Sequence, residues 1–437
     1  MKNVKVIDSM PSSGKTQWMI QHIDELDWET KVIYITPFLL ETERIKKSCK
    51  GRNFQLPEAK HGQGSKLTHL KELIRQDRNI ASTHSLFGMI DQETMDLIEA
   101  NNYILVLDEV MEVIAPLDIL TDADDLTDDE RKRIVKQDMK VLISKGFVNI
   151  DKHYQVSWNN EEAVLSKYQT LKESIDNGQV YFSASSLLLQ AFSPDIFRTD
   201  IFKEIYVMTY QFDFQIQSYY FRFFDIPYEK FGVIKQRPNK RVRYEFSFVS
   251  YEEYLVYDLL KRLELKEIIN ICDSPILNGL GALSLQYGDR SVRLSKSDYQ
   301  KRGADGRKDI QRKATSYLKN HLGDKASTMM WTCFKDYRDE IKSKRFPDKH
   351  FVALNARATN DYRDKSGILY LVNRFINPYF PHLFRTKDID FDGDAFALAE
   401  MLQFIFRSQI RDDKPIDIYI PSERMRNLLT RWLEGEF

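Results

Sequence analysis

Residues 9–16 read Ser-Met-Pro-Ser-Ser-Gly-Lys-Thr and follow an apolar run at residues 4–7, a pattern that predicts a strand entering a phosphate-binding loop. In such a loop, backbone N–H groups surround the β-phosphate of a nucleotide, Lys15 neutralises phosphate charge, and the Thr16 hydroxyl binds Mg²⁺. A plain surface turn before a helix is the alternative interpretation. The candidate nucleotide contacts are Ser9, which stands where the motif normally has its first glycine, and Pro11, Ser12, Ser13, Gly14, Lys15 and Thr16.

Two adjacent carboxylates, Asp108 and Glu109, end a second apolar run at residues 103–107. In nucleoside triphosphatases, an aspartate at such a strand end holds the Mg²⁺ shell, and its neighbour can orient the attacking water. Two acids at a strand end can also belong to a solvated loop, but the phosphate-binding loop earlier in the chain favours the metal role. We therefore predict ATP and Mg²⁺ as cofactors, with Thr16 and Asp108 as metal ligands.

The elements that must position these residues alternate between strand and helix. Before residue 116 the pattern predicts strands at 4–7, 31–36, 79–82 and 103–107 and helices at 15–26, 37–48 and 65–75. Thr36 is the expected N-cap of the second helix and Pro37 its first residue. Such alternation predicts a doubly wound parallel sheet with its ligand at the carboxyl ends of the strands.

The remainder of the chain is expected to complete this domain and to form a second one. Residues 116–178 are predicted to be a mostly helical insertion, and the aromatic segment 219–224 to cross between domains. We predict an α/β protein with domains at 1–215 and 216–437 and a possible accessory segment at about 273–325. Later strands are expected at 179–183, 204–209, 267–272, 328–332, 350–354 and 416–420, and later helices at 251–263, 307–321, 336–343 and 394–407.

Polar residues after several predicted strands are candidates for nucleic-acid contacts. Thr36 with Pro37 and Thr83 with His84 each follow a strand, where free N–H groups at a helix start can bind a phosphate; ordinary helix capping is the alternative. Residues 355–361 also follow a predicted strand and suit phosphate contacts, nucleotide sensing or a plain turn. The candidates in that segment are Arg357, Thr359 and Asn360.

Three residues spaced four apart near the C-terminus, Gln403, Arg407 and Arg411, share one face of a predicted helix. They can face a γ-phosphate, where an arginine stabilises the charge of the transition state, or they can form a solvated helix face. The acids at 388–394 imitate the start of a calcium loop, but Ala399 stands where that loop needs glutamate, so a helix N-cap explains them better. The basic stretch 235–243 can line a groove for a nucleic-acid strand or be a solvated loop.

Composition narrows the class of protein. The chain has 437 residues, 42% hydrophobic and 30% charged, with 64 basic and 65 acidic side chains, so two or three domains are expected and a strongly basic coat protein is excluded. The three cysteines match no zinc spacing and fit a reducing cytoplasm. We expect no membrane span, because no apolar run reaches about 18 residues. The first residues run directly into a strand, so we expect no signal peptide.

The order of these motifs resembles that of superfamily 2 helicases, and it is most similar to helicases encoded by tailed bacteriophages. The sequence Asp-Glu-Val-Met-Glu from Asp108 is similar to that of herpesvirus origin-binding helicases. In chain order the matches are 9–16 (motif I), 36–37 (Ia), 83–84 (Ib), 108–109 (II), 183–185 or Thr209 (III), 331–335 (IV), 355–361 (V) and Gln403, Arg407 and Arg411 (VI).

The resemblance implies two RecA-like domains, ATP bound between two lobes, nucleic acid held across both, and ATP-driven movement on DNA. Motif VI departs from the usual Gln-x-x-Gly-Arg-x-Gly-Arg, because Phe406 and Gln409 replace its glycines and Arg411 comes one residue late. Which arginine faces the phosphate therefore stays open. No adenine-reading glutamine motif precedes the loop, so base discrimination is expected to be weak or to come from elsewhere.

We therefore predict an ATP-dependent DNA helicase or translocase of phage DNA replication or recombination. It would bind single-stranded or forked DNA mainly through the backbone and act as a monomer or weak oligomer in the host cytoplasm. Replication proteins are candidate partners. Two alternatives stay open, a DNA-packaging ATPase of the terminase kind and a nucleotide-regulated DNA-binding protein without unwinding activity. ATP turnover that DNA stimulates would favour the helicase or translocase over the nucleotide-regulated DNA-binding protein.

Overall fold

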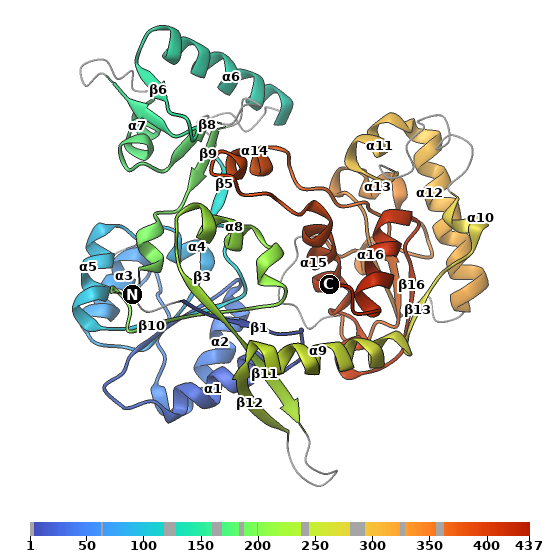
Figure 1. Ribbon diagram of the computed structural model, residues 1–437, viewed down its shortest axis with the longest axis horizontal. Coiled ribbons are helices and arrows are strands. Elements are labelled where there is room, and N and C mark those ends of the chain that lie inside the picture. Colours follow the sequence, from blue (N-terminus) through green and yellow to red (C-terminus); the bar gives the residue numbers. More distant parts are fainter. Residues whose placement is uncertain are drawn as a thin grey trace. The chain divides into compact units, whose positions relative to one another are not determined.

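The computed structural model divides into two compact units, each made of three separate segments of the chain. Figure 1 labels the helices and strands and colours them along the sequence. The first unit comprises Met1–Ile7, Met19–Lys230 and Asn377–Phe391, and the second comprises Asp8–Trp18, Phe231–Ile376 and Asp392–Phe437. The loop at 9–14 therefore groups with the second unit. The structure describes residues 4–62, 64–117, 128–159, 168–182, 188–198, 200–236, 244–279, 293–323, 328–354 and 362–437.

The larger sheet has the strand order β12-β11-β1-β10-β4-β2-β3. Strand β10 pairs in parallel with β4, β4 with β2, and β2 with β3. All five residues of β2 are buried, and so are the first four of β4, as continuous apolar runs in a parallel sheet require. The strands are β1 (Val4–Asp8), β2 (Val32–Thr36), β3 (Ile80–Thr83), β4 (Ile104–Asp108), β10 (Glu204–Thr209), β11 (Tyr228–Gln236) and β12 (Glu245–Ser250).

The helices connecting these strands follow the predicted alternation, except that α4 (His84–Phe87) and α5 (Gln92–Asn101) between β3 and β4 were not predicted and the second helix starts later than expected. Helix α2 begins at Leu39, not at residue 37, and its N-cap is Phe38, which makes no side-chain capping bond. Thr36 is not the cap, because its hydroxyl donates to the Phe38 carbonyl at 3.0 Å. The other helices here are α1 (Lys15–Glu25) and α3 (Lys66–Arg75).

The segment predicted as a mostly helical insertion is mixed. Along the chain, an antiparallel pair of strands, β6 (Val148–Ile150) and β7 (Val156–Trp158), lies between helices α6 (Asp128–Ser144) and α7 (Gln169–Asp176). The pattern missed this pair because each strand has three residues, too few for an alternation to show. Next to it, β5 (Ile114–Pro116), β9 (Leu188–Ala191) and β8 (Val180–Phe182) form a small antiparallel sheet. A separate apolar core holds the segment together, with Met139, Leu142, Val148, Val156, Leu171 and Ile175 among its members.

The aromatic segment predicted to cross between domains is instead a core helix of the first unit, α8 (Ile216–Phe223). Its aromatic side chains are buried nearly all round, which suits a helix inside a core rather than a connection. The Tyr219 ring lies 5.5 Å from that of Phe384 in α14 (Tyr379–Arg385), a later segment that returns to this unit.

The second unit is built on a four-stranded parallel sheet of order β13-β16-β15-β14, and the predicted α/β class is confirmed, although β11 and β12 pair antiparallel at the edge of the larger sheet. The predicted strand at 350–354 is wrong, since only Phe351 bridges to Trp331. Strand β15 was missed because its four buried residues follow a polar stretch. The strands are β13 (Ile269–Ile271), β14 (Met329–Thr332), β15 (Gly367–Tyr370) and β16 (Ile416–Tyr419).

Helices cover this second sheet, and several of them are short. None of the helices in the described residues is long and apolar enough to cross a membrane. The helices of this unit are α9 (Tyr251–Lys266), α10 (Pro275–Asn278), α11 (Lys296–Lys301), α12 (Gly303–Tyr317), α13 (Arg338–Ile341), α15 (Gly393–Ile405) and α16 (Glu423–Leu433).

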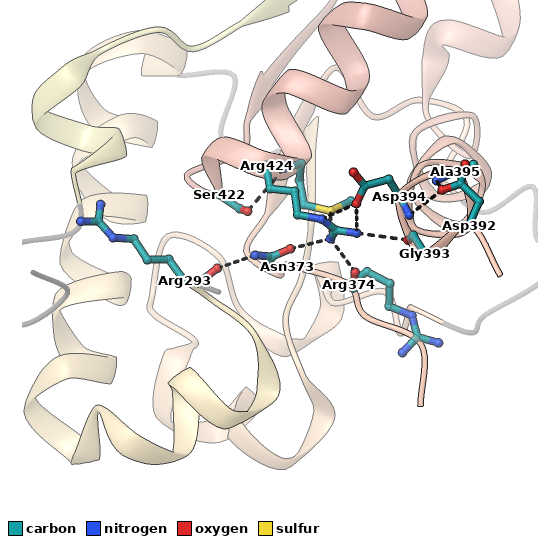
Figure 2. A network of polar contacts seen from close by, with 10 residues as sticks. Arg293, Asn373, Arg374, Asp392, Gly393, Asp394, Ala395, Ser422 and Arg424 are labelled. Carbon is teal, nitrogen blue, oxygen red and sulfur yellow. Dashed lines mark hydrogen bonds and ion pairs between the residues drawn. The ribbon is translucent and has the colours of Figure 1, made fainter. Parts of the chain in front are cut away.

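Arg424 joins three segments of the second unit through one guanidinium group (Figure 2). It donates to the Asp394 carboxylate at 2.7 Å and to the Gly393 carbonyl at 3.1 Å, at the start of α15. It also donates to the Asn373 side chain at 2.9 Å and to the Arg374 carbonyl at 2.8 Å, just after β15. This side chain is 13% exposed, so its removal would leave several acceptors poorly solvated.

We expect Arg424→Ala to lower the free energy of unfolding by about 1–3 kcal/mol, because the acceptors at Asn373 and the main chain lose a charged donor. Chemical denaturation measures this. Arg431→Ala is the matched control on the same helix, since its pair with Glu436 is half exposed on both sides, and it should change stability much less than Arg424→Ala. Equal losses in the two variants would contradict a structural role for the network.

Candidate nucleotide-binding site

The loop between β1 and α1 has the backbone geometry of an anion-binding turn. Ser12 and Gly14 have positive φ angles of 70° and 93° and alternate with ordinary residues. The Ser13 N–H donates to the Met10 carbonyl at 3.1 Å, and the Trp18 N–H donates to the Gly14 carbonyl at 2.8 Å, which starts the helix. Alternation of this kind turns successive N–H groups to one side and makes a concavity for an anion.

Lys15 lies against the start of this loop. Its ammonium donates to the Ser9 carbonyl at 2.5 Å and to the Met10 carbonyl at 3.2 Å. Ser9, the residue that departs from the glycine pattern, is fully buried, and its hydroxyl accepts the Val233 N–H of β11 at 2.8 Å. The serine therefore satisfies a neighbouring backbone donor that a glycine would leave without a partner.

A buried polar relay on α9 holds the first part of the loop, and the sequence analysis missed it. The Met10 N–H donates to the Tyr254 hydroxyl at 2.6 Å, and that hydroxyl donates to Asp258 at 3.0 Å. Arg262 donates to the other oxygen of Asp258 at 2.6 Å. The available signal was a polar stripe with a spacing of four, on a helix whose exposed side chains include Leu255, Val256, Leu259, Leu260 and Leu263.

We expect Tyr254→Phe to lower the free energy of unfolding by about 1–3 kcal/mol, because the Met10 N–H and Asp258 would each lose a partner in a buried place. Chemical denaturation and amide exchange at the loop measure the effect. Tyr257→Phe on the same helix is the control, since the Tyr257 hydroxyl makes only a 3.5 Å contact with the Lys235 carbonyl. Unchanged stability and loop exchange in Tyr254→Phe would contradict the positioning role.

Asp108 and Glu109 lie at the carboxyl end of β4 in the first unit. The Tyr34 hydroxyl donates to Asp108 at 3.0 Å. Burial raises the pKa of Asp108 to about 7, and the neighbouring Glu109 charge adds to the effect. Glu109 has φ of 77°, and its N–H donates to the Met208 carbonyl of β10 at 3.0 Å. A cation beside Asp108 would favour its ionised form.

The predicted metal ligands fit Mg²⁺ in chemical type. The Asp108 carboxylate and the Thr16 hydroxyl are hard oxygen donors, and Mg²⁺ usually takes one or two such protein ligands together with phosphate and water. Across the part of the chain that the structure describes, no group of three or more His, Cys, Asp or Glu side chains could hold a metal ion.

Arg407 and Arg411 were predicted to share one face of a helix, but they do not. Helix α15 ends at Ile405, and Ser408 breaks the pattern by capping a short 3₁₀ turn at Gln409–Asp412. Arg407 is 6% exposed and donates to the Ala353 carbonyl at 3.4 Å. Arg411 reaches the phosphate-binding loop, where its Nε donates to the Ser12 hydroxyl at 3.3 Å. Gln403 stays on α15 and is partly buried.

The candidate nucleic-acid contacts have structural partners where the structure describes them. Thr83 caps the four-residue helix α4, of which His84 is the first residue. Thr209 is buried and accepts the Gln215 side-chain amide at 2.9 Å. Asp392 caps α15, as the capping interpretation of the acids at 388–394 predicted. Residues 183–185 and 237–243 lie outside the described residues, as do Arg357, Thr359 and Asn360.

A strand, a Gly-Lys-Thr loop and a helix follow one another in this chain, on the scaffold of an α/β protein. Residues 263–433 match the family described as the YonV C-terminal Rossmann-like domain, and residues 130–190 match the YonV middle domain. The SPbeta prophage-derived uncharacterized protein YonV of Bacillus subtilis (strain 168) is 34% identical over 445 residues, which cover 100% of both chains. The chain belongs to the YonV family.

Solved structures with a similar arrangement include an apo form of XPD, with 12% identity and a TM-score of 0.44 over 99% of this chain and 95% of that one. The DUF1998 helicase MrfA bound to DNA and AMPPNP gives 9% identity and a TM-score of 0.32, over 100% of this chain and 48% of that one.

Proposed function

We propose that this protein is an ATP-dependent DNA helicase or translocase that acts in phage DNA replication or recombination. The observation that carries the proposal is the loop at 9–16, where Lys15 lies on the loop and the Arg411 guanidinium contacts it through Ser12. A cationic side chain from a distant part of the sequence at a phosphate-binding loop is what phosphoryl transfer requires. The prophage origin of the YonV relative supports the phage setting.

Each residue of the site has a proposed role. Lys15 and the loop N–H groups would bind the β- and γ-phosphates. Thr16 and Asp108 would hold Mg²⁺, which neutralises charge on the phosphates when it is bound. Glu109 would orient the attacking water, and Arg411 would stabilise the charge that develops on the γ-phosphate.

DNA is the proposed partner, in single-stranded or forked form and held mainly through its backbone. The proposed contacts on the first unit are Thr36 and Pro37 after β2 and Thr83 and His84 after β3, at the carboxyl ends of neighbouring parallel strands. Parallel strands place these residues on one edge of the sheet. On the second unit the proposed contacts are Arg357, Thr359 and Asn360.

The deciding experiment measures ATP hydrolysis by the full chain alone and with single-stranded, duplex and forked DNA, followed by strand displacement on forks with either tail. We expect hydrolysis that needs Mg²⁺ and rises with DNA, and displacement of one strand. Hydrolysis without any response to DNA would overturn the translocase proposal and leave a nucleotide-regulated protein. DNA cleavage with Mn²⁺ would favour a packaging ATPase, although Asp392 and Asp394 of the acidic cluster are engaged in capping and in the pair with Arg424.

A further inference from the structure

Strand β12 places an aromatic ring directly against the phosphate-binding loop. A Cβ atom built on Gly14 would lie 2.1 Å from Cε1 and 2.2 Å from Cδ1 of Phe246. Real side chains never come so close, so the edge of the Phe246 ring rests on the Gly14 backbone where only glycine leaves room. Phe246 is partly buried, so part of its ring stays accessible beside the loop.

A three-ring stack fixes this face of β12 to the first turn of α1. Phe248 lies two residues after Phe246 and therefore on the same face of the strand. Its ring stacks on Trp18 at 4.7 Å and 15° and on Phe231 at 4.7 Å and 26°. Antiparallel pairing with β11 sets Phe246 opposite Lys235 and holds the register. The position of Phe246 at the loop is therefore defined by the strand pairing and by packing, not by chance contact.

We propose that Phe246 is the stacking surface for the base of the bound nucleotide. The inference rests on the proposed function, because it names the base-binding part of the same site. The proposal requires that, with the β-phosphate in the loop, the base lies beside the first turn of α1, which is the turn that Trp18 and Phe248 attach to β12.

Stacking has a consequence for substrate choice. A phenyl ring interacts with the face of any base and makes no hydrogen bond to its edge, so it tolerates all bases and favours those with a larger face. The substrate class is therefore nucleoside triphosphates in general, with purines bound somewhat more tightly than pyrimidines. We expect ATP and GTP to have KM values within about fivefold of each other, because nothing in a stacking contact distinguishes them.

The test compares nucleotides with inorganic tripolyphosphate, which has the phosphates but no base. Phe246→Ala should raise the KM for ATP about tenfold and leave the affinity for magnesium tripolyphosphate unchanged, and Phe246→Trp should restore the ATP value. Val249→Ala is the control, because Val249 lies on the opposite face of β12 and should change neither. Protein folding in each variant is checked by circular dichroism and thermal melting.

The outcomes separate this inference from the proposed function. An equal loss of affinity for ATP and tripolyphosphate in Phe246→Ala would show that the ring only supports the loop, and it would overturn the stacking role. Wild-type discrimination between ATP and GTP by more than about 100-fold would also overturn it, since that requires edge recognition. If wild-type protein hydrolyses neither compound, the proposed function fails, and stacking fails with it.

Discussion

Replacement of Lys15 by alanine is expected to lower the turnover of ATP by at least about 10²–10³-fold while the protein stays folded. The Lys15 ammonium donates to the Ser9 and Met10 carbonyls of its own loop, where its charge would face a bound phosphate. Tyr254 and Val233 also hold this part of the loop, through hydrogen bonds with the Met10 N–H and the Ser9 hydroxyl. We therefore expect removal of the ammonium to weaken phosphate binding while these other contacts keep the loop in place.

The measurement for Lys15→Ala is the steady-state release of phosphate, with and without DNA, beside a thermal melt. Lys31→Ala is the control, since Lys31 is a partly buried lysine whose ammonium also donates to a carbonyl, that of Trp28 at 2.9 Å. The control should retain wild-type turnover. Wild-type turnover in Lys15→Ala would remove the loop at 9–16 from the mechanism and with it the whole functional proposal.

The parallel strands that carry the site could be predicted because burial on both faces leaves a continuous apolar run in the sequence. Strands β2, β4 and β10 agree with their predicted positions within one residue, and β10 agrees at both ends. The loop could be predicted because its glycine and lysine belong to a short motif that is recognised without knowledge of the rest of the fold. By contrast, β15, β6 and β7 were missed although β14, β13 and β8 of the same lengths were predicted, so a run of three or four residues does not by itself identify a strand.

The residues that support the loop from a distance could not be predicted. Tyr254 and Phe246 follow the loop by more than two hundred positions, and their roles depend on the folding of β12 and α9 against it. Local rules also fail where a side chain has a competing partner. Thr36 bonds to the Phe38 carbonyl instead of capping, and Ser408 ends the helical spacing on which the alignment of Arg407 with Arg411 depended.

Because Arg407 and Arg411 do not share a helix face, their roles can be tested separately. Arg411→Ala should lower kcat about 10³-fold or more, with the Kd for ATP changed only a few-fold, because a guanidinium at the γ-phosphate acts mainly on the transition state. Its Nε contact with Ser12 already places it at the loop. Arg411→Lys should recover little, since lysine keeps the charge but loses the planar pair of donors. Single-turnover hydrolysis and nucleotide titration measure the two quantities separately.

Arg407→Ala should act on stability instead of chemistry. The Arg407 side chain is buried and donates to the Ala353 carbonyl, so its loss leaves a cavity and a weakly solvated acceptor, worth about 2–4 kcal/mol of unfolding free energy. The kcat per folded molecule should stay within about threefold of wild type, since a buried structural contact contributes to both states of the reaction alike. A loss of kcat in Arg407→Ala with an unchanged melt, together with normal turnover in Arg411→Ala, would reverse the assignment. The Ser12 contact of Arg411 would then be a feature of packing, and the charge at the γ-phosphate would come from Arg407.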